Sequence, residues 1–381
     1  MLERSKREEI SKFLYSNFKS MRTMGRFAFK KDFNIRPRLG DYTHVSLFCL
    51  RYLSMAYLYP IVIYDFYNIG KVLGYFGVYS LPSEKMQLLR SIRKKLMDVF
   101  GGVVYKNIRY GWTEIGGGIV ELVEINKDKN FIKYRLYESP VLPSENRINH
   151  PGCFMQLGGL CGIIEGLSGK SCDGIEKKCI LMGDKYCEFH LYIREEEKMP
   201  KFEQLSREEF KLGLDAFIDY IVNGRYRLRK MSRDYIHISI NQALNYILLS
   251  ISKGHVVLSK FSGRRIGEEI AEKTKIRNLF DMLDYLRDVF SFLKIGIVET
   301  EMLPDKIIVR VEESAYSYGV KDIGMKLCIF IAGIIEGSLE KSTGAKWNVE
   351  EGKCIANGDK HCEFECKTEN PKDLEKMLLG Y

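Results

Sequence analysis

The 381-residue sequence contains no uninterrupted run of 18 apolar residues, the length that a membrane-spanning helix requires. The closest candidate, residues 52–64, contains Ser54 and Pro60 and lies between Arg51 and Asp65. The first residues also lack the apolar core of a signal peptide. We therefore expect a cytoplasmic protein without a membrane span.

Proline is scarce as well, with nine residues, and the 33 glycines follow no short period. These numbers exclude a fibrous or low-complexity chain. Apolar residues make up 45% of the sequence and charged residues 29%, so the chain can bury a core and disorder is excluded as its main state. The length fits two domains of ordinary size.

The motifs of several common enzyme classes are missing. The sequence has no Gly-rich dinucleotide-binding fingerprint, no phosphate-binding loop and no nucleophile elbow. Residues 196–232 predict one amphipathic helix and a strand rather than a helix-turn-helix. A binding protein is therefore favoured over an enzyme, and nucleic acid is disfavoured as a partner.

Charge is distributed unevenly. The formal net charge is +9, and residues 1–38 contribute +7 of it. A basic arm could contact nucleic acid or anionic lipid. The favoured interpretation is a solvated helix, because one apolar stripe recurs there at helical spacing. The stripe consists of Ile10, Phe13, Leu14, Phe18 and Met21.

The chain is a tandem repeat. With a constant offset of 175, fifteen of the 37 residues in 153–189 are identical to their counterparts in 328–364. The similarity extends upstream with small gaps, for example from residues 41–46 to residues 234–239. We therefore predict two copies of one domain, at 1–195 and 206–381, joined by a linker at 196–205 that contains Pro200.

Each copy is predicted to be α+β, a helix-covered antiparallel sheet. In the first copy we expect helices over 6–20, 41–57 and 83–100, a strand that carries Phe27 and Phe29 on one face, and strands over 102–109, 117–125 and 131–138. In the second copy we expect helices over 206–222, 234–252 and 272–291, and strands over 295–300 and 306–313. A glycine-bearing helix and a hairpin close each copy.

Cysteine gives the strongest functional signal. Six of the ten cysteines recur as Cys-x25-Cys-x7-Cys in both copies, with a glutamate three residues before the middle cysteine. A Gly-Asp pair lies midway between the last two cysteines and predicts a tight turn that places them opposite each other. Two facing thiolates suit one Zn²⁺.

The first cysteine of each pattern, Cys153 or Cys328, is expected at the start of the glycine-bearing helix, where the helix dipole favours a thiolate. The recurring glutamate can complete a tetrahedral, closed structural site. Two zinc ions per chain are therefore predicted. Alternatives are a redox switch, a cross-strand disulfide or inert buried thiols. Four further cysteines have no counterpart in the other copy and are expected to be ordinary core or surface residues: Cys49, Cys161, Cys172 and Cys366.

These motifs resemble the vinyl-4-reductase (4-vinyl reductase) domain family. The first copy has Arg36-Pro-Arg-Leu-Gly-Asp41, the glycines at 158 and 162, and Glu176-x-x-Cys179 followed by Gly183-Asp184 and Cys187-Glu-Phe189. The second copy keeps the closing segment, from Glu351 to Phe364, but offers only Met231-Ser-Arg-Asp234 in place of the Arg-Pro element.

The resemblance implies a ligand-binding α+β domain of the NO-signalling and Golgi-transport type, related to the aromatic-sensing domain of bacterial activators. It also implies zinc ligation by three cysteines and one glutamate. The ligands would be Cys153, Glu176, Cys179 and Cys187, and by the repeat Cys328, Glu351, Cys354 and Cys362. Such domains pair, so the two copies are expected to form an internal pseudo-dimer, and formation of a homo-oligomer remains open.

A sensor of this kind needs an apolar cavity with a few polar groups. The first copy is rich in aromatic residues, and from these and a recurring histidine we select His44, Tyr52, Phe66 and Trp112 as candidate ligand contacts. The second copy has fewer aromatic residues, and we expect it to bind more weakly.

The function predicted from the sequence is therefore a zinc-structured small-molecule-binding sensor or regulatory protein for an apolar or aromatic ligand. The alternatives are a redox-responsive regulator that uses the same cysteines, and a reductase or assembly subunit that acts with a partner.

Overall fold

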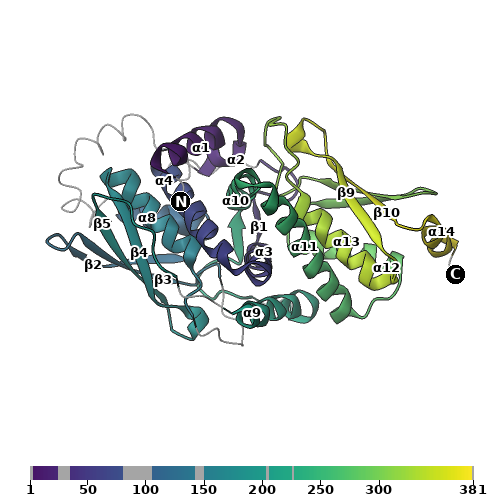
Figure 1. The fold of residues 1–381 in the computed structure, drawn as a ribbon, viewed down its shortest axis with the longest axis horizontal. Coiled ribbons are helices and arrows are strands. Elements are labelled where there is room, and N and C mark those ends of the chain that lie inside the picture. Colours follow the sequence, from purple (N-terminus) through teal and green to yellow (C-terminus); the bar gives the residue numbers. More distant parts are fainter. Residues whose placement is uncertain are drawn as a thin grey trace.

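The structure is a computed structural model, and it describes residues 3–24, 35–79, 105–141, 150–202, 206–224 and 227–379. The predicted strand around Phe27 and Phe29 and the predicted helix over 83–100 lie outside these ranges. Two lobes lie side by side in Figure 1, one built from each half of the sequence.

The first lobe is built from the first half of the described chain. Its helices are α1 (Arg4–Asn17), α2 (Lys19–Met24), α3 (Val45–Leu58), α4 (Ile63–Tyr79), α7 (Tyr105–Glu114) and α8 (Phe154–Ser168), with short 3₁₀ turns at Pro60–Val62 and Ile180–Met182. Its strands are β1 (Tyr42–His44), β2 (Ile119–Asn126), β3 (Phe131–Tyr137), β4 (Ser171–Lys178) and β5 (Cys187–Arg194).

The second lobe repeats this order. Its helices are α9 (Arg207–Asp219), α10 (Ile238–Ile251), α11 (Lys253–Thr274), α12 (Leu279–Phe292), α13 (Ile329–Thr343) and α14 (Pro371–Leu379), with a π turn at Tyr220–Gly224 and a 3₁₀ turn at Ile355–Asn357. Its strands are β6 (Tyr235–His237), β7 (Ile297–Met302), β8 (Ile307–Glu312), β9 (Trp347–Lys353) and β10 (Cys362–Thr368).

The two main sheets have the same topology. The strand order is β2-β3-β5-β4 in the first lobe and β7-β8-β10-β9 in the second, and every neighbouring pair is antiparallel. The predicted α+β class and the tandem repeat are therefore confirmed. The strand predicted over 102–109 is wrong from residue 105 onward, because Tyr105, Ile108 and Trp112 follow helical spacing and pack against the core from α7.

Glycines bring two helices together above each sheet. In the first lobe, a Cβ on Gly158 or Gly162 of α8 would collide with the backbone carbonyls of Tyr67 or Lys71 on α4. Gly70 of α4 faces α8 in the same way, and Gly263 and Gly333 repeat the arrangement between α11 and α13. Tight helix packing is therefore the role of these glycines. Neither α4 nor α11 is among the helices predicted from the sequence.

The lobes are joined by a short antiparallel ladder between β1 and β6. Thr43 lies opposite Ile236, and Tyr42 and His44 lie opposite His237 and Tyr235. These are equivalent residues taken in reverse order, so an approximate two-fold axis passes through the Thr43–Ile236 pair. Backbone hydrogen bonds on either side obey the same symmetry: Val45 N donates to Asp234 O, and Ile238 N donates to Asp41 O, each over 2.9 Å.

A buried arginine from each copy reaches into the other. Arg36 Nη1 donates to the carbonyl oxygens of Lys294 (2.8 Å) and Glu313 (3.2 Å), and burial lowers its pKa to about 10. Arg229 Nη1 donates in the same way to the carbonyl oxygens of Gly116 (2.8 Å) and Glu138 (3.4 Å).

An aspartate holds each of these loops in shape. Asp41 accepts the N–H of Arg36, and Asp234 accepts the N–H of Arg229. The Arg36-to-Asp41 element is thus a contact between copies, and the second copy has its counterpart at Arg229-to-Asp234. Its apparent absence from the second copy is no reason to expect weaker ligand binding there.

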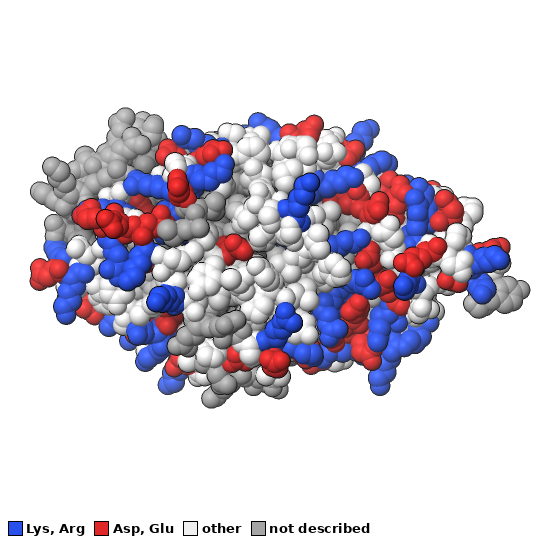
Figure 2. All heavy atoms as spheres, in the orientation of Figure 1, with Lys and Arg blue, Asp and Glu red and all other residues white. Residues whose placement is uncertain are grey.

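The N-terminal helix packs through its apolar stripe. Leu14, Phe18 and Met21 are fully buried, and Ile10 and Phe13 pack against them at the edge. The interpretation as a helix with a solvated face is therefore supported for this segment. On the face shown in Figure 2, lysine and arginine alternate with aspartate and glutamate over both lobes, and the middle of the face carries few charges.

A buried ion network fixes the connection between the lobes. Arg7 of α1 and Lys71 of α4 both contact Glu165 of α8 and Glu197, which lies beyond β5, over 2.7–3.2 Å. The start of the predicted linker is therefore bound to the first lobe. None of the helices in the described ranges has both the length and the apolar character needed to span a membrane.

Candidate metal centres and ligand site

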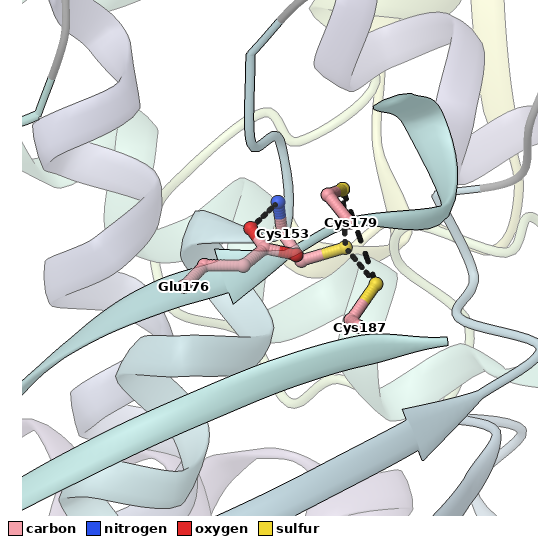
Figure 3. A group of neighbouring side chains, drawn as sticks. All are labelled: Cys153, Glu176, Cys179 and Cys187. Atoms are coloured by element: carbon pink, nitrogen blue, oxygen red, sulfur yellow. Dashed lines mark hydrogen bonds between the residues drawn. The ribbon is translucent and has the colours of Figure 1, made fainter. Parts of the chain in front are cut away.

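Four predicted metal ligands meet at one end of the first sheet (Figure 3). Cys153 directly precedes α8, Glu176 lies on β4, Cys179 follows β4, and Cys187 begins β5. Their ligand atoms all lie within 4.8 Å of one another. All three thiols are free and fully buried.

The second copy builds the same cluster from Cys328, Glu351, Cys354 and Cys362, whose ligand atoms also lie within 4.8 Å of one another. Cys328 precedes α13, Glu351 lies on β9, and Cys362 begins β10. The structure therefore places the eight residues identified by the repeat in two clusters of four, one in each copy.

The Gly-Asp pair shapes the loop that carries the middle cysteine. Gly183 ends the 3₁₀ turn at φ +90°, a conformation that favours glycine, and Asp184 Oδ2 accepts the N–H of Cys179 over 3.0 Å. Gly358 and Asp359 do the same for Cys354, where the hydrogen bond is 2.8 Å. The predicted hairpin is present, but its connection is this wider loop rather than a two-residue turn.

The sulfur positions fit a tetrahedral ion. With Zn–S bonds near 2.3 Å, tetrahedral geometry separates the sulfurs by about 3.8 Å. The Sγ–Sγ distances are 3.4 and 3.9 Å from Cys153 to Cys187 and to Cys179, and 3.9 Å between Cys179 and Cys187. In the second copy Cys362 lies 3.5 Å from Cys328 and 4.0 Å from Cys354.

The glutamate also has one oxygen available. Glu176 Oε2 accepts the N–H of Cys153 over 2.8 Å, and Glu351 Oε2 accepts the N–H of Cys328 over 2.9 Å. The other oxygen, Oε1, is buried in both residues and has no hydrogen-bond partner among the described residues. An unpaired buried oxygen beside three thiols is what a fourth metal ligand would look like before the ion binds.

Burial makes one glutamate and one cysteine of each cluster hold their protons, whereas hydrogen bonds from neighbouring thiols, despite burial, lower the pKa of Cys179 and Cys362. Burial raises the pKa of Glu176 and Glu351 well above the ordinary value, and it does the same for the thiols of Cys153 and Cys328. A metal ion would therefore displace protons from each cluster, and its affinity should fall as the pH falls.

The sequence motif does not include the serines that support the clusters. Ser139 Oγ lies 3.3 Å from Cys153 Sγ, and Ser314 Oγ lies 3.3 Å from Cys328 Sγ. Both serines end a segment that the repeat conserves, Arg135–Ser139 and Arg310–Ser314, so the signal was present in the sequence. The second cluster has an additional hydroxyl, Ser317 Oγ, 3.0 Å from Cys362 Sγ.

The four predicted ligand contacts do not form one pocket. Tyr52 and Phe66 pack against each other with ring centroids 4.6 Å apart, and the Tyr52 hydroxyl donates to Gly152 O over 2.7 Å, next to the first cluster. His44 instead caps α3 at the junction of the copies and contacts Tyr220.

Trp112 also lies away from the Tyr52–Phe66 pair. Its indole donates to Gly117 O, and its ring covers Gly159 of α8. The four side chains therefore fill three separate parts of the packed structure.

A narrow apolar crevice is present in the second lobe instead. Leu283, Leu286 and Phe290 of α12 form one wall, and the others come from β7, β8 and α13, through Val298, Thr300, Val309 and Ile335. Its cavity volume is about 10 Å³, enough for one water molecule. The corresponding wall of the first lobe comes from α7, because Ile115 O accepts the N–H of His237 just as Leu293 O, at the end of α12, accepts the N–H of His44.

Both copies match one protein family. The V4R domain profile matches residues 132–193 and again residues 307–368, which include all four ligands of each cluster and the serine beside it. The uncharacterized protein MJ0150 of Methanocaldococcus jannaschii is 32% identical over 154 residues, covering 40% of this chain and 87% of that protein. The chain belongs to the V4R domain family.

Two solved structures have weaker similarity to this V4R protein. A vinyl-4-reductase family protein from M. jannaschii is 21% identical, with a TM-score of 0.25, over 29% of this chain and 68% of that one. The phenol-responsive sensory domain of the activator PoxR, solved with phenol, is 15% identical, with a TM-score of 0.28, over 39% and 73%. At these scores the similarity says nothing about ligand or activity.

Proposed function

We propose that this V4R protein is a small-molecule-binding protein whose two lobes are each stabilised by one structural zinc ion. The observation that carries the zinc part of the proposal is the pair of equivalent clusters, each with three thiols and one unpaired carboxylate oxygen. Three sulfur ligands select zinc over magnesium or calcium, and four protein ligands leave no open position for catalysis.

The zinc ions would act on stability. Each would join the start of α8 or α13 to two strands of the adjacent sheet. Structural zinc sites in small peptides stabilise the fold by about 10 kcal/mol or more, so removal of the ion should loosen the segment from Cys179 to Cys187 or its counterpart.

Metal content of the purified full-length protein tests this proposal. The wild-type protein should carry two zinc ions, and Cys179→Ser and Cys354→Ser should each remove one. Cys366→Ser is the matched control, because Cys366 is equally buried on β10 but lies outside the cluster. Zinc content near zero in the wild type, with all thiols titrating freely, would overturn the proposal.

For the small molecule we propose the crevice between α12 and the second sheet. Its lining is almost entirely apolar, and Thr300 provides a hydroxyl at its exposed rim. In the present conformation the crevice has room for only one water molecule, so a ligand would have to move α12 outward. An aromatic ring that buries about 100 Å² of apolar surface would gain about 2.5 kcal/mol in return.

Thermal unfolding of the full-length protein with a panel of small aromatic and isoprenoid compounds tests this part. A ligand should raise the midpoint for the wild type and have no effect on Val298→Phe, which fills the crevice. Val257→Phe, at an exposed position on α11, should respond like the wild type. If no compound raises the midpoint of the wild type, the small-molecule proposal fails and an assembly role becomes the better explanation.

A further inference from the structure

Arg51 of α3 is completely buried, and no described residue of the first copy forms an ion pair with it. Its guanidinium reaches into the second lobe, where Nη2 donates to Ser259 Oγ over 3.2 Å. The rings of Tyr316 and Phe330 lie 5.2 Å from the guanidinium carbon. Arg51 is thus a residue of one copy enclosed by side chains of the other.

The bonding of this guanidinium is incomplete. Nε and Nη1 have no hydrogen-bond partner among the described residues, and no described carboxylate forms an ion pair with it. Burying an unpaired charge costs several kcal/mol, and the two aromatic rings offset only part of that cost. Burial lowers the pKa of Arg51, and the groups that oppose this are Tyr316 and then Cys328.

The residues that surround Arg51 are close in sequence to the second metal cluster and are linked to it by hydrogen bonds. Phe330 follows Cys328 by two residues at the start of α13. Tyr316 N donates to Ser314 Oγ over 3.3 Å, and the same Oγ lies 3.3 Å from Cys328 Sγ. Each ring that encloses the guanidinium therefore belongs to a residue two positions from Cys328 or from the serine beside it.

An occupied cluster would have the charge that Arg51 lacks. Zn²⁺ with three thiolates and one carboxylate has a net charge of −2, and that charge would be buried. We propose that Arg51, contributed by the first copy, is the counter-cation of the metal centre in the second copy. This inference rests on the proposed zinc binding, and it makes the second centre dependent on a residue from the other lobe.

At the first centre, the position equivalent to Arg51 holds no cation. The offset of 193 that relates Thr43 to Ile236 across the two-fold axis places Leu244 at the position equivalent to Arg51. Leu244 is a buried core residue. The two centres thus share one donor set but differ in the charge beside it, so Arg51 should strengthen metal binding at the second centre alone.

Zinc affinities of full-length variants test this. In the Cys179→Ser background, where only the second centre is complete, Arg51→Met should raise the Kd for Zn²⁺ by roughly 10- to 100-fold, the usual effect of losing a group that supports metal ligands. Arg51→Lys should restore most of the affinity, because it keeps the charge. Leu244→Met in the Cys354→Ser background is the matched control and should leave the Kd of the first centre unchanged.

A second measurement separates charge from folding. In the otherwise wild-type chain, Arg51→Met should retain one zinc ion per chain after dialysis against a chelator that leaves two in the wild type. The retained ion reports that the first lobe remains folded. An unchanged Kd for Arg51→Met, or equal losses for Arg51→Lys and Arg51→Met, would overturn the role of Arg51. A parent protein that binds no zinc would overturn the proposed function as well.

Discussion

Glu138 and Glu313 occupy equivalent positions in the two copies and share a left-handed backbone conformation, with φ of 53° and 51°. Each carboxylate accepts backbone N–H groups from the other copy. Residues 38 and 39 donate to Glu313, and residues 230–232 donate to Glu138. The junction between the lobes is therefore reciprocal, because each copy supplies both an arginine loop and the glutamate that receives the other loop.

Arg36→Ala should therefore destabilise the whole chain. The substitution leaves the carbonyl oxygens of Lys294 and Glu313 without their donor, and we expect a loss of about 2–4 kcal/mol in the free energy of unfolding by urea. Arg38→Ala is the matched control, because the Arg38 side chain is exposed and forms a surface ion pair with Glu312; its loss should cost about 0–1 kcal/mol. Equal losses for the two variants would show that Arg36 does not hold the junction.

The helix pair above the first sheet should tolerate no side chain at its glycines. Gly162→Ala places a methyl group against the carbonyl oxygen of Lys71, so α4 and α8 must separate, at a cost of about 1–3 kcal/mol in thermal or chemical unfolding. Gly77→Ala, on the open side of α4, should be neutral or stabilising by about 0.4–1 kcal/mol. A stable Gly162→Ala protein would contradict the close approach of the two helices.

Stability should fall in mild acid because two histidines at the junction are buried. Burial lowers the pKa of His44 to about 4 and of His237 to about 3, and in both residues Nδ1 accepts a backbone N–H. The unfolded chain takes up these protons near pH 6.5, so the stability is complete above pH 6.5 and is lost as the pH falls toward 3.

The variant His237→Asn keeps a helix-capping side chain but cannot take up the proton. At pH 4 it should avoid about 3 kcal/mol of the acid-induced loss, measured as the free energy of unfolding against pH. His361→Asn, at a partly exposed position directly before β10, should behave like the wild type. Identical profiles for the wild type and His237→Asn would exclude His237 as a source of acid sensitivity.

The buried ion network should be costly to break on one side. Glu165→Ala removes a buried carboxylate that pairs with both Lys71 and Arg7, and we expect a loss of about 3–5 kcal/mol in the free energy of unfolding. Glu195→Ala removes an exposed pair with Lys170 and should cost about 0–1 kcal/mol. Urea unfolding distinguishes the two, and a small loss for Glu165→Ala would mean that the network contributes little.

The parts of this protein that can be predicted from its sequence are those fixed by short-range spacing. The Cys-x25-Cys-x7-Cys pattern and its Gly-Asp pair place the ligands within one helix start and one hairpin, so the repeat leads directly to both clusters. The glycines of α8 and α13 were also informative. Their counterparts have the same four-residue spacing, at Gly70 and Gly74 on α4 and at Gly263 and Gly267 on α11. They indicate α4 and α11 only when the two helices of a pair are considered together.

The parts that escape prediction depend on contacts between distant residues. Arg36 and Arg51 look alike in the sequence, yet one binds backbone carbonyls across the junction and the other lies among aromatic rings near Cys328. His44 looks like a pocket residue because it recurs, but it recurs because the β1–β6 ladder needs the same helix cap on both sides. Neither role has a local pattern that would distinguish it.

The ladder between β1 and β6 has a final consequence for how the two halves can change. In a dimer of identical chains, every substitution appears on both sides of the axis. Here the halves are encoded separately, so position 51 can be arginine while position 244 is leucine, and the axis remains intact. One lobe can therefore specialise without altering the other, and the protein can carry out two different tasks with one architecture.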